Sequence, residues 1–93
     1  MIIGILKLDI YIPTSSSLKD KRRITKSLIT RLRNNFNISI SEIDYQDLWQ
    51  RTLLGVGMVA NGNIRIHQSF SKIINFVEKE KEVYLIASKE EIF

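Results

Sequence analysis

Few side chains in this chain of 93 residues have the types and spacing of a catalytic or metal site. His67 is the only histidine, and no second histidine or carboxylate stands at a metal-ligand spacing from it. This favours a surface position over a role as ligand or base. The absence of cysteine excludes disulfides, a thiol nucleophile and a thiolate metal site.

Three carboxylates, Glu42, Asp44 and Asp47, cluster at an expected hairpin. Paired carboxylates can transfer protons or hold a divalent metal. Hairpin ends are also commonly acidic because solvent reaches them. We therefore expect a non-enzymatic protein without catalytic residues, metal or cofactor, and an enzyme or metal binder built on these carboxylates is the weakest alternative.

The basic residues gather in one segment. Residues 17–34 hold seven Lys or Arg and one Asp, a net charge of +6, whereas the rest of the chain has a net charge of −2. On a helical projection, apolar side chains fill one arc and the opposite arc carries the candidate nucleic-acid contacts Lys19, Arg22, Arg23, Lys26 and Arg33. Such a local excess is expected of a surface that meets phosphates or another anion, although solvated Lys/Arg-rich helices are common.

Lys21 breaks this separation because it falls within the apolar arc. Either its long side chain extends out of the core to solvent, or it meets a buried carboxylate or a ligand near the helix start. Lys21, Trp49 and Arg51 are therefore further candidate contacts.

The pattern predicts this helix over residues 17–36. Ser17, followed by Asp20, suits its first turn, since a hydroxyl can accept from a free backbone N–H and a carboxylate meets the positive end of the helix dipole. The asparagines that follow suit a left-handed end of the helix. They are Asn34, Asn35 and Asn37.

Alternation of apolar residues predicts the strands. We expect strands over residues 1–12, over 38–45 with a bulge, over 48–60, and over 83–87 with a possible extension to 93. Turns are expected at 46–47 and 60–63, where an asparagine can cap a second helix over about 64–81.

The order strand, helix, strand, strand, helix, strand predicts a single α+β domain over residues 1–93. The expected architecture is a ferredoxin-like βαββαβ sandwich, with a four-stranded antiparallel sheet of order 4-1-3-2 and two helices on one face. No basic leader or cleavage site precedes the first strand, and no apolar run approaches a membrane span. We therefore expect a cytoplasmic protein.

The sheet face without helices is expected to be smooth and partly apolar. Gly55 and Gly57 fall on it, and a mid-strand glycine often marks close approach by another backbone. A second copy, packed sheet to sheet, is the favoured cover. The alternative is nucleic acid stacked on aromatics, but Tyr11 and Trp49 lie near strand ends. The expected dimer face comprises Ile3, Ile5, Leu53, Gly55, Gly57 and Val59.

Several segments resemble the YlxP-like family of small bacterial proteins. They are Ile2-Ile3-Gly4, Ser17-Leu18-Lys19-Asp20-Lys21-Arg22-Arg23, Lys26-Ser27-Leu28, Arg31-Leu32-Arg33, Phe36-Asn37, Asp47-Leu48-Trp49-Gln50-Arg51 and Gly55-Val56. The resemblance implies a ferredoxin-like fold and no known catalytic residues. Genes of the family often neighbour those of transcription and translation factors, which implies contact with RNA or the ribosome.

Two functions are therefore expected. The first is a non-enzymatic accessory protein that binds RNA or the ribosome through the basic helix. The alternative is a homodimeric structural or protein-interaction module without nucleic-acid binding.

Overall fold

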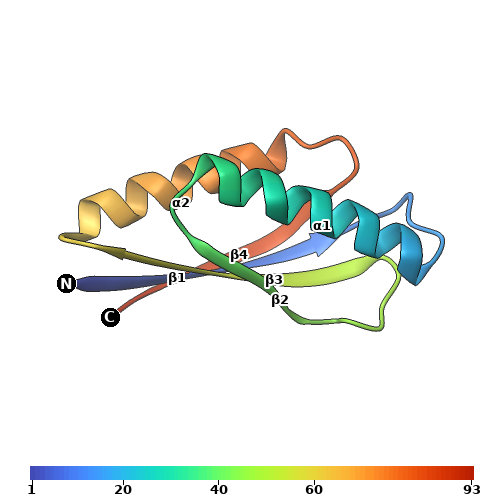
Figure 1. The fold of residues 1–93 in the computed structure, drawn as a ribbon, viewed down its shortest axis with the longest axis horizontal. Coiled ribbons are helices and arrows are strands. Elements are labelled where there is room, and N and C mark those ends of the chain that lie inside the picture. The colour runs from blue at the N-terminus through green and yellow to red at the C-terminus, as the bar shows by residue number, and fades with distance from the viewer.

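A computed structural model describes all 93 residues and contains the six expected elements in the expected order (Figure 1). The fold is α+β, as predicted. Neither helix has the length and apolar composition that a membrane crossing requires. The elements are β1 (Ile2–Tyr11), α1 (Leu18–Asn35), β2 (Ser39–Asp44), β3 (Arg51–Ala60), α2 (Asn63–Glu78) and β4 (Tyr84–Ile92).

The four strands form one antiparallel sheet in the order β2-β3-β1-β4. This confirms the predicted order, read from the other edge. The central strands pair in a register that places Leu6 opposite Val56 and Leu8 opposite Leu54, so these apolar side chains share one face. Both helices lie on that side of the sheet (Figure 1), and the opposite face carries no helix.

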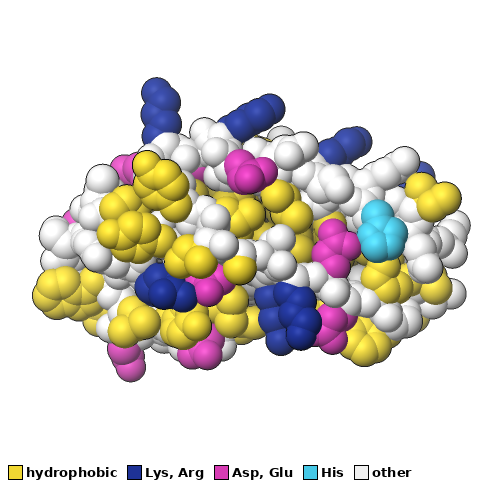
Figure 2. All heavy atoms as spheres, turned by 180° about the vertical axis from the view of Figure 1, so that it is seen from behind, with side chains coloured by type: hydrophobic (Ala, Val, Ile, Leu, Met, Phe, Trp, Pro, Cys, Tyr) yellow, Lys and Arg dark blue, Asp and Glu magenta, His cyan; other side chains and the backbone are white.

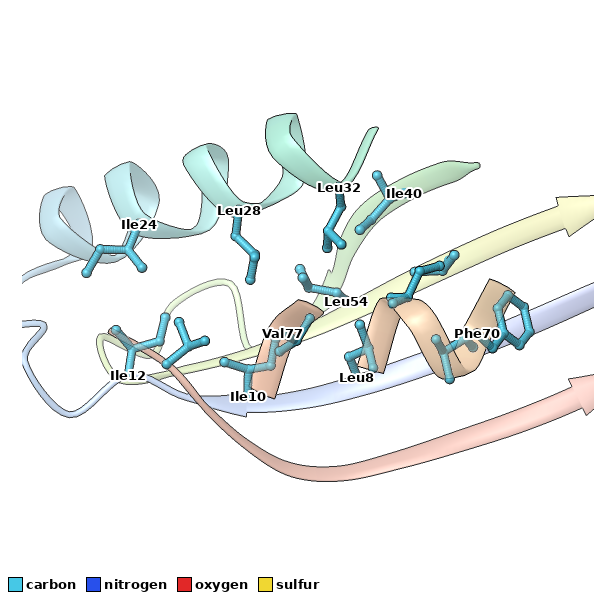
Figure 3. Packing of buried hydrophobic residues seen from close by; sticks show 14 of the residues in the cluster. Leu8, Ile10, Ile12, Ile24, Leu28, Leu32, Ile40, Leu54, Phe70 and Val77 are labelled. Atoms are coloured by element: carbon cyan, nitrogen blue, oxygen red, sulfur yellow. The ribbon is translucent and has the colours of Figure 1, made fainter. Parts of the chain in front are cut away.

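The core fills the space between the helices and this sheet face. From α1, Ile24, Leu28 and Leu32 point toward the strands (Figure 3) and are almost completely buried. Burying one such side chain stabilises the fold by roughly 1.5–3 kcal/mol. The stripe therefore fixes which side of α1 faces solvent. The other core side chains are Leu6, Leu8, Ile10, Ile12, Ile40, Leu54, Val56, Ile66, Phe70, Ile73, Val77 and Val83.

Helix α1 begins as predicted but ends differently. The N-cap is Ser17, whose Oγ accepts from the backbone N–H of Asp20 at 3.0 Å. The expected left-handed asparagine is wrong, because the C-cap is Phe36 with an extended φ of −135°. The Phe36 ring packs against the core and edge-on against Phe76, while Asn35 Nδ2 donates to the carbonyl oxygen of Arg31 at 2.7 Å.

The second half of the chain differs from expectation at the ends of its elements. The N-cap of α2 is Gly62, which makes no side-chain cap hydrogen bond, so the expected asparagine cap is wrong. The helix ends at Glu78, earlier than predicted. Strand β4 reaches Ile92, which confirms the possible extension of the last strand, because its second half continues to pair with β1.

The hairpin of β2 and β3 contains the predicted bulge, between Glu42 and Asp44. Ile43 is the unpaired residue of the bulge, and it covers Gly55: a Cβ built on Gly55 would lie 2.9 Å from Ile43 Cγ2. A Cβ built on Gly57 would meet nothing within 4 Å. The close approach of Ile43 therefore explains why position 55 is a glycine, whereas Gly57 faces open space.

Candidate nucleic-acid interface

A groove between α1 and the edge strand β2 collects polar and basic side chains. Its volume is about 440 Å³. Helix α1 runs beside β2 in Figure 1, and β2 has no further strand on its outer side. We call this hollow the α1–β2 groove. It is lined by Lys21, Arg22, Thr25, Lys26, Ile29, Thr30, Arg33 and Glu42.

Four exposed basic side chains of α1 have no carboxylate partner, and we call them the basic stripe: Lys19, Arg22, Lys26 and Arg33. At 1.5 Å per residue, the stripe extends for about 21 Å along the helix. Arg33 donates from Nη2 to the backbone carbonyl oxygen of Ile40 at 3.2 Å, which holds its guanidinium at the edge of β2. A row of exposed cations without counter-charges attracts polyanions.

Two further arginines of α1 do not line the groove. Arg31 forms an ion pair with Glu80, and Arg23 Nη2 lies 3.9 Å from Glu82 Oε1. The Arg23 and Glu82 side chains are both more than half exposed, so solvent screens their attraction. The structure thus separates Arg23 from the other four candidate contacts and places it beside an acidic neighbour.

Lys21 is buried, with 1% of its surface exposed. The expectation that it extends to solvent is wrong, and the alternative, a carboxylate partner, is correct. Its Nζ lies 2.7 Å from Glu42 Oε2 and donates to the carbonyl oxygens of Tyr45 at 2.6 Å and Gln46 at 3.3 Å. Thr52 Oγ1 donates to the same Glu42 oxygen at 2.5 Å. This network ties the start of α1 to β2, to β3 and to the loop between them.

The remaining candidate contacts, Trp49 and Arg51, lie outside the groove. Strand β3 begins at Arg51, so Trp49 lies in the preceding loop instead of a strand, with 56% of its surface exposed. Arg51 is used within the protein. Its Nη2 donates to both carboxylate oxygens of Asp9 at 2.9 Å, and its guanidinium lies 5.0 Å from the centre of the Tyr45 ring.

The first turn of α1 contains one carboxylate, Asp20. The Ser16 hydroxyl donates to Asp20 Oδ2 at 2.9 Å, and the Ser16 backbone N–H donates to the same oxygen at 3.3 Å. These hydrogen bonds, together with Arg23 and Lys19 nearby, hold the pKa of Asp20 below its ordinary value of 3.8. Asp20 is therefore charged at neutral pH and meets the positive end of the helix dipole.

His67 lies on the surface, as predicted, and its Nδ1 is 2.9 Å from Glu90 Oε2. Of the hairpin carboxylates, Glu42 belongs to the Lys21 network, and Asp44 accepts from the backbone N–H of Tyr45 at 2.7 Å. No three His, Asp or Glu side chains gather where they could hold a metal ion. Glu42 and Asp44 thus make separate hydrogen bonds, and Asp47 is exposed without a hydrogen bond or ion pair of its side chain.

The residues of the expected dimer face lie on the side of the sheet without helices, as the alternation of apolar residues predicted. Ile3 and Val59 pair across β1 and β3 and are 40% and 60% exposed. At the neighbouring edge of the sheet is a hollow of about 430 Å³, lined in part by Ile3, Gly57 and Val59 of this face and by Ile38 and Met58, which pack against the core. Figure 2, which shows the molecule from behind, looks onto the side that carries the histidine of α2, where exposed hydrophobic side chains are mixed with basic and acidic ones. Dimerisation itself stays a prediction.

Sequence reasoning missed the groove because its two walls, although consecutive elements of the chain, meet only through tertiary packing, which brings Glu42 of β2 against Lys21 of α1. A signal was nevertheless present. Lys21 falls in the apolar arc of α1, and Glu42 falls in phase with Ile38 and Ile40, which face the helices. Two opposite charges directed into the same layer indicate a buried ion pair. No feature of the sequence indicated that Thr25 lines the groove.

Comparisons with known proteins agree with the family resemblance. A family described as "Protein of unknown function (DUF503)" matches residues 3–90. The chain is also 35% identical over 91 residues to "Uncharacterized protein YlxP" of Bacillus subtilis (strain 168), which covers 98% of this chain and 99% of that protein. The chain therefore belongs to the DUF503 family of proteins of unknown function and is similar to YlxP over nearly its whole length.

Proposed function

We propose that this protein is a non-enzymatic accessory protein that binds RNA or the ribosome through the basic stripe. The observation that carries the proposal is that Lys19, Arg22, Lys26 and Arg33 are exposed without carboxylate partners, although the chain has ten acidic residues. Had these side chains been paired internally, no free positive charge would face outward from this helix.

The proposal also includes the domain assignment and the cellular location. We assign residues 1–93 to one ferredoxin-like domain, because its element order and strand order are those of the split βαβ arrangement. We place the protein in the cytoplasm, where RNA and ribosomes are available to it.

Electrostatic contact with phosphates predicts a definite salt dependence. Each phosphate that a Lys or Arg neutralises releases condensed counterions. Four contacts give a slope of log affinity against log salt of about −3 to −4, and loss of three contacts reduces this slope by about 2 to 3.

The test is a charge reversal of the groove-lining part of the stripe, with Arg22, Lys26 and Arg33 each changed to Glu. The matched control changes Arg65, Lys72 and Lys79 to Glu, three exposed basic residues in or directly after α2. Both triple variants change the net charge equally, so non-specific attraction falls equally in both.

Binding to ribosomal RNA fragments and to ribosomal subunits is measured by mobility shift or co-sedimentation across a salt series. We expect the groove variant to lose most of its binding and to have a salt slope smaller by about 2 to 3, and the α2 variant to retain most of both. Thermal unfolding of each variant shows whether it is folded. Equal losses in the two variants, or no RNA binding by the unaltered protein, would contradict the proposal.

A second candidate function is that of a dimeric structural or protein-interaction module without nucleic-acid binding. The exposed pair Ile3 and Val59, the hollow beside it and the uncovered Gly57 favour it, because apolar patches on soluble proteins commonly mark interfaces. Light scattering coupled to size exclusion tests it. We expect a dimer that Val59→Lys converts to a monomer, and a monomeric unaltered protein at micromolar concentration would remove this candidate.

A further inference from the structure

The wall of the α1–β2 groove contains an unusual hydroxyl group. Thr25 is 7% exposed, and its Oγ1 is the one buried side-chain nitrogen or oxygen in the structure without a hydrogen-bond partner. Buried polar groups are normally paired, because an unpaired one retains its desolvation cost. An unpaired hydroxyl beside a groove is explained most simply by a ligand that completes its hydrogen bonding.

The groove also contains a carboxylate that phosphate binding does not require. Glu42 uses Oε2 for Lys21 and Thr52, whereas its Oε1 has no protein partner. A carboxylate oxygen repels phosphate but accepts a hydrogen bond from a hydroxyl. Glu42 therefore favours a ligand that brings hydroxyl groups together with negative charge.

Ribose phosphate has this combination. Phosphates suit Arg22, Lys26 and Arg33, while a 2′-hydroxyl can donate to Glu42 Oε1. It can also accept from Thr25 Oγ1 once that hydroxyl, which is closed to solvent in the unbound protein, turns toward the groove. The volume of about 440 Å³ is in the range of small-ligand pockets, which suits one or two nucleotides of a single strand.

We propose that the α1–β2 groove binds the sugar–phosphate backbone of single-stranded RNA and distinguishes it from DNA by contacts of Thr25 and Glu42 with the 2′-hydroxyl. This inference rests on the proposed function, because the basic stripe supplies the attraction to phosphate. It adds that two sets of side chains have different roles in binding. The cations set affinity and salt dependence, and the two oxygen-bearing side chains set the preference for ribose.

Thr25→Val tests whether the Thr25 hydroxyl contributes to the preference for ribose. Valine keeps the branched shape and removes only the hydroxyl, which makes no hydrogen bond within the protein. Removing an unpaired buried polar group does not destabilise a fold. We therefore expect an unfolding midpoint equal to or above that of the unaltered protein. Thr25→Ser, which keeps the hydroxyl, is the matched control.

Binding is measured with oligo(U) and oligo(dU) of equal length across a salt series. A hydrogen bond lost to a neutral group costs about tenfold in affinity or somewhat less, and the hydrogen bond to the charged Glu42 adds to it, so we expect the unaltered protein to prefer RNA by at least about tenfold. In Thr25→Val we expect RNA affinity to fall by about tenfold or somewhat less, while DNA affinity and the salt slope stay unchanged and Glu42 retains its part of the preference. Thr25→Ser should retain the preference.

Equal affinities of the unaltered protein for RNA and DNA would overturn the inference, and so would an equal loss of both affinities in Thr25→Val. In either case, salt-dependent binding that the groove charge reversal abolishes leaves the proposed function intact. Absence of binding to either oligonucleotide and to ribosomal RNA would overturn both.

Discussion

Replacement of Lys21 by Met should markedly destabilise the protein. Lys21 is buried, and its ammonium lies 2.7 Å from Glu42 Oε2 while donating to the carbonyl oxygens of Tyr45 and Gln46. Methionine has a similar length and helix propensity, so the variant retains the packing of the stem and removes the charge and its hydrogen bonds.

The magnitude follows from the environment of Glu42. Removing one partner of a fully buried ion pair costs about 3–5 kcal/mol. The Glu42 side chain is 21% exposed, so water replaces part of the lost contact. We therefore expect a loss of about 2–4 kcal/mol, which lowers the unfolding midpoint by roughly 10–30 °C in a domain of this size.

The assay is thermal and urea unfolding of Lys21→Met beside Lys19→Met. Lys19 is exposed two residues away on the same helix, so its replacement should change stability by less than about 0.5 kcal/mol. Adding Glu42→Gln to Lys21→Met should cost less than Glu42→Gln alone, because the two side chains act as a pair. If Lys21→Met proves as stable as Lys19→Met, the ammonium contributes nothing to the fold and this reasoning is refuted.

Two further predictions concern the helix start and the sheet. Because the folded-state pKa of Asp20 is lowered, its contribution to stability is present above its unfolded pKa near 3.8 and is lost as pH falls through the folded value. Asp20→Asn should therefore reduce the loss of stability below about pH 4 in acid unfolding, and an unchanged acid profile would contradict the assignment. A Cβ on Gly4 would lie 2.5 Å from Ile66 Cγ2, so Gly4→Ala should destabilise the protein by about 1–3 kcal/mol. Gly57→Ala, which meets open space, serves as its control in the same unfolding measurement, and equal stabilities of the two variants would count against this packing.

The sequence was sufficient for the architecture because the responsible patterns are local. The alternation of β1, the apolar stripe of α1 and the serine cap each involve residues within a few positions of one another. These patterns predicted the order of elements, the strand order and the side of α1 that faces solvent. The errors lie at element ends, such as Phe36, where a tertiary contact competes with local capping preference.

The tertiary structure decided the chemistry of the candidate site. The sequence grouped five basic residues by helical angle, whereas the fold brought Glu82 beside Arg23 and left the basic stripe without carboxylate partners. It also placed Glu42 of β2 against Lys21 near the opposite end of the preceding helix. Whether a charge is paired depends on positions of distant side chains within a few ångströms. Helical and strand periodicity specify direction alone, so the sequence determined which faces point outward and the fold determined which charges remain free on them.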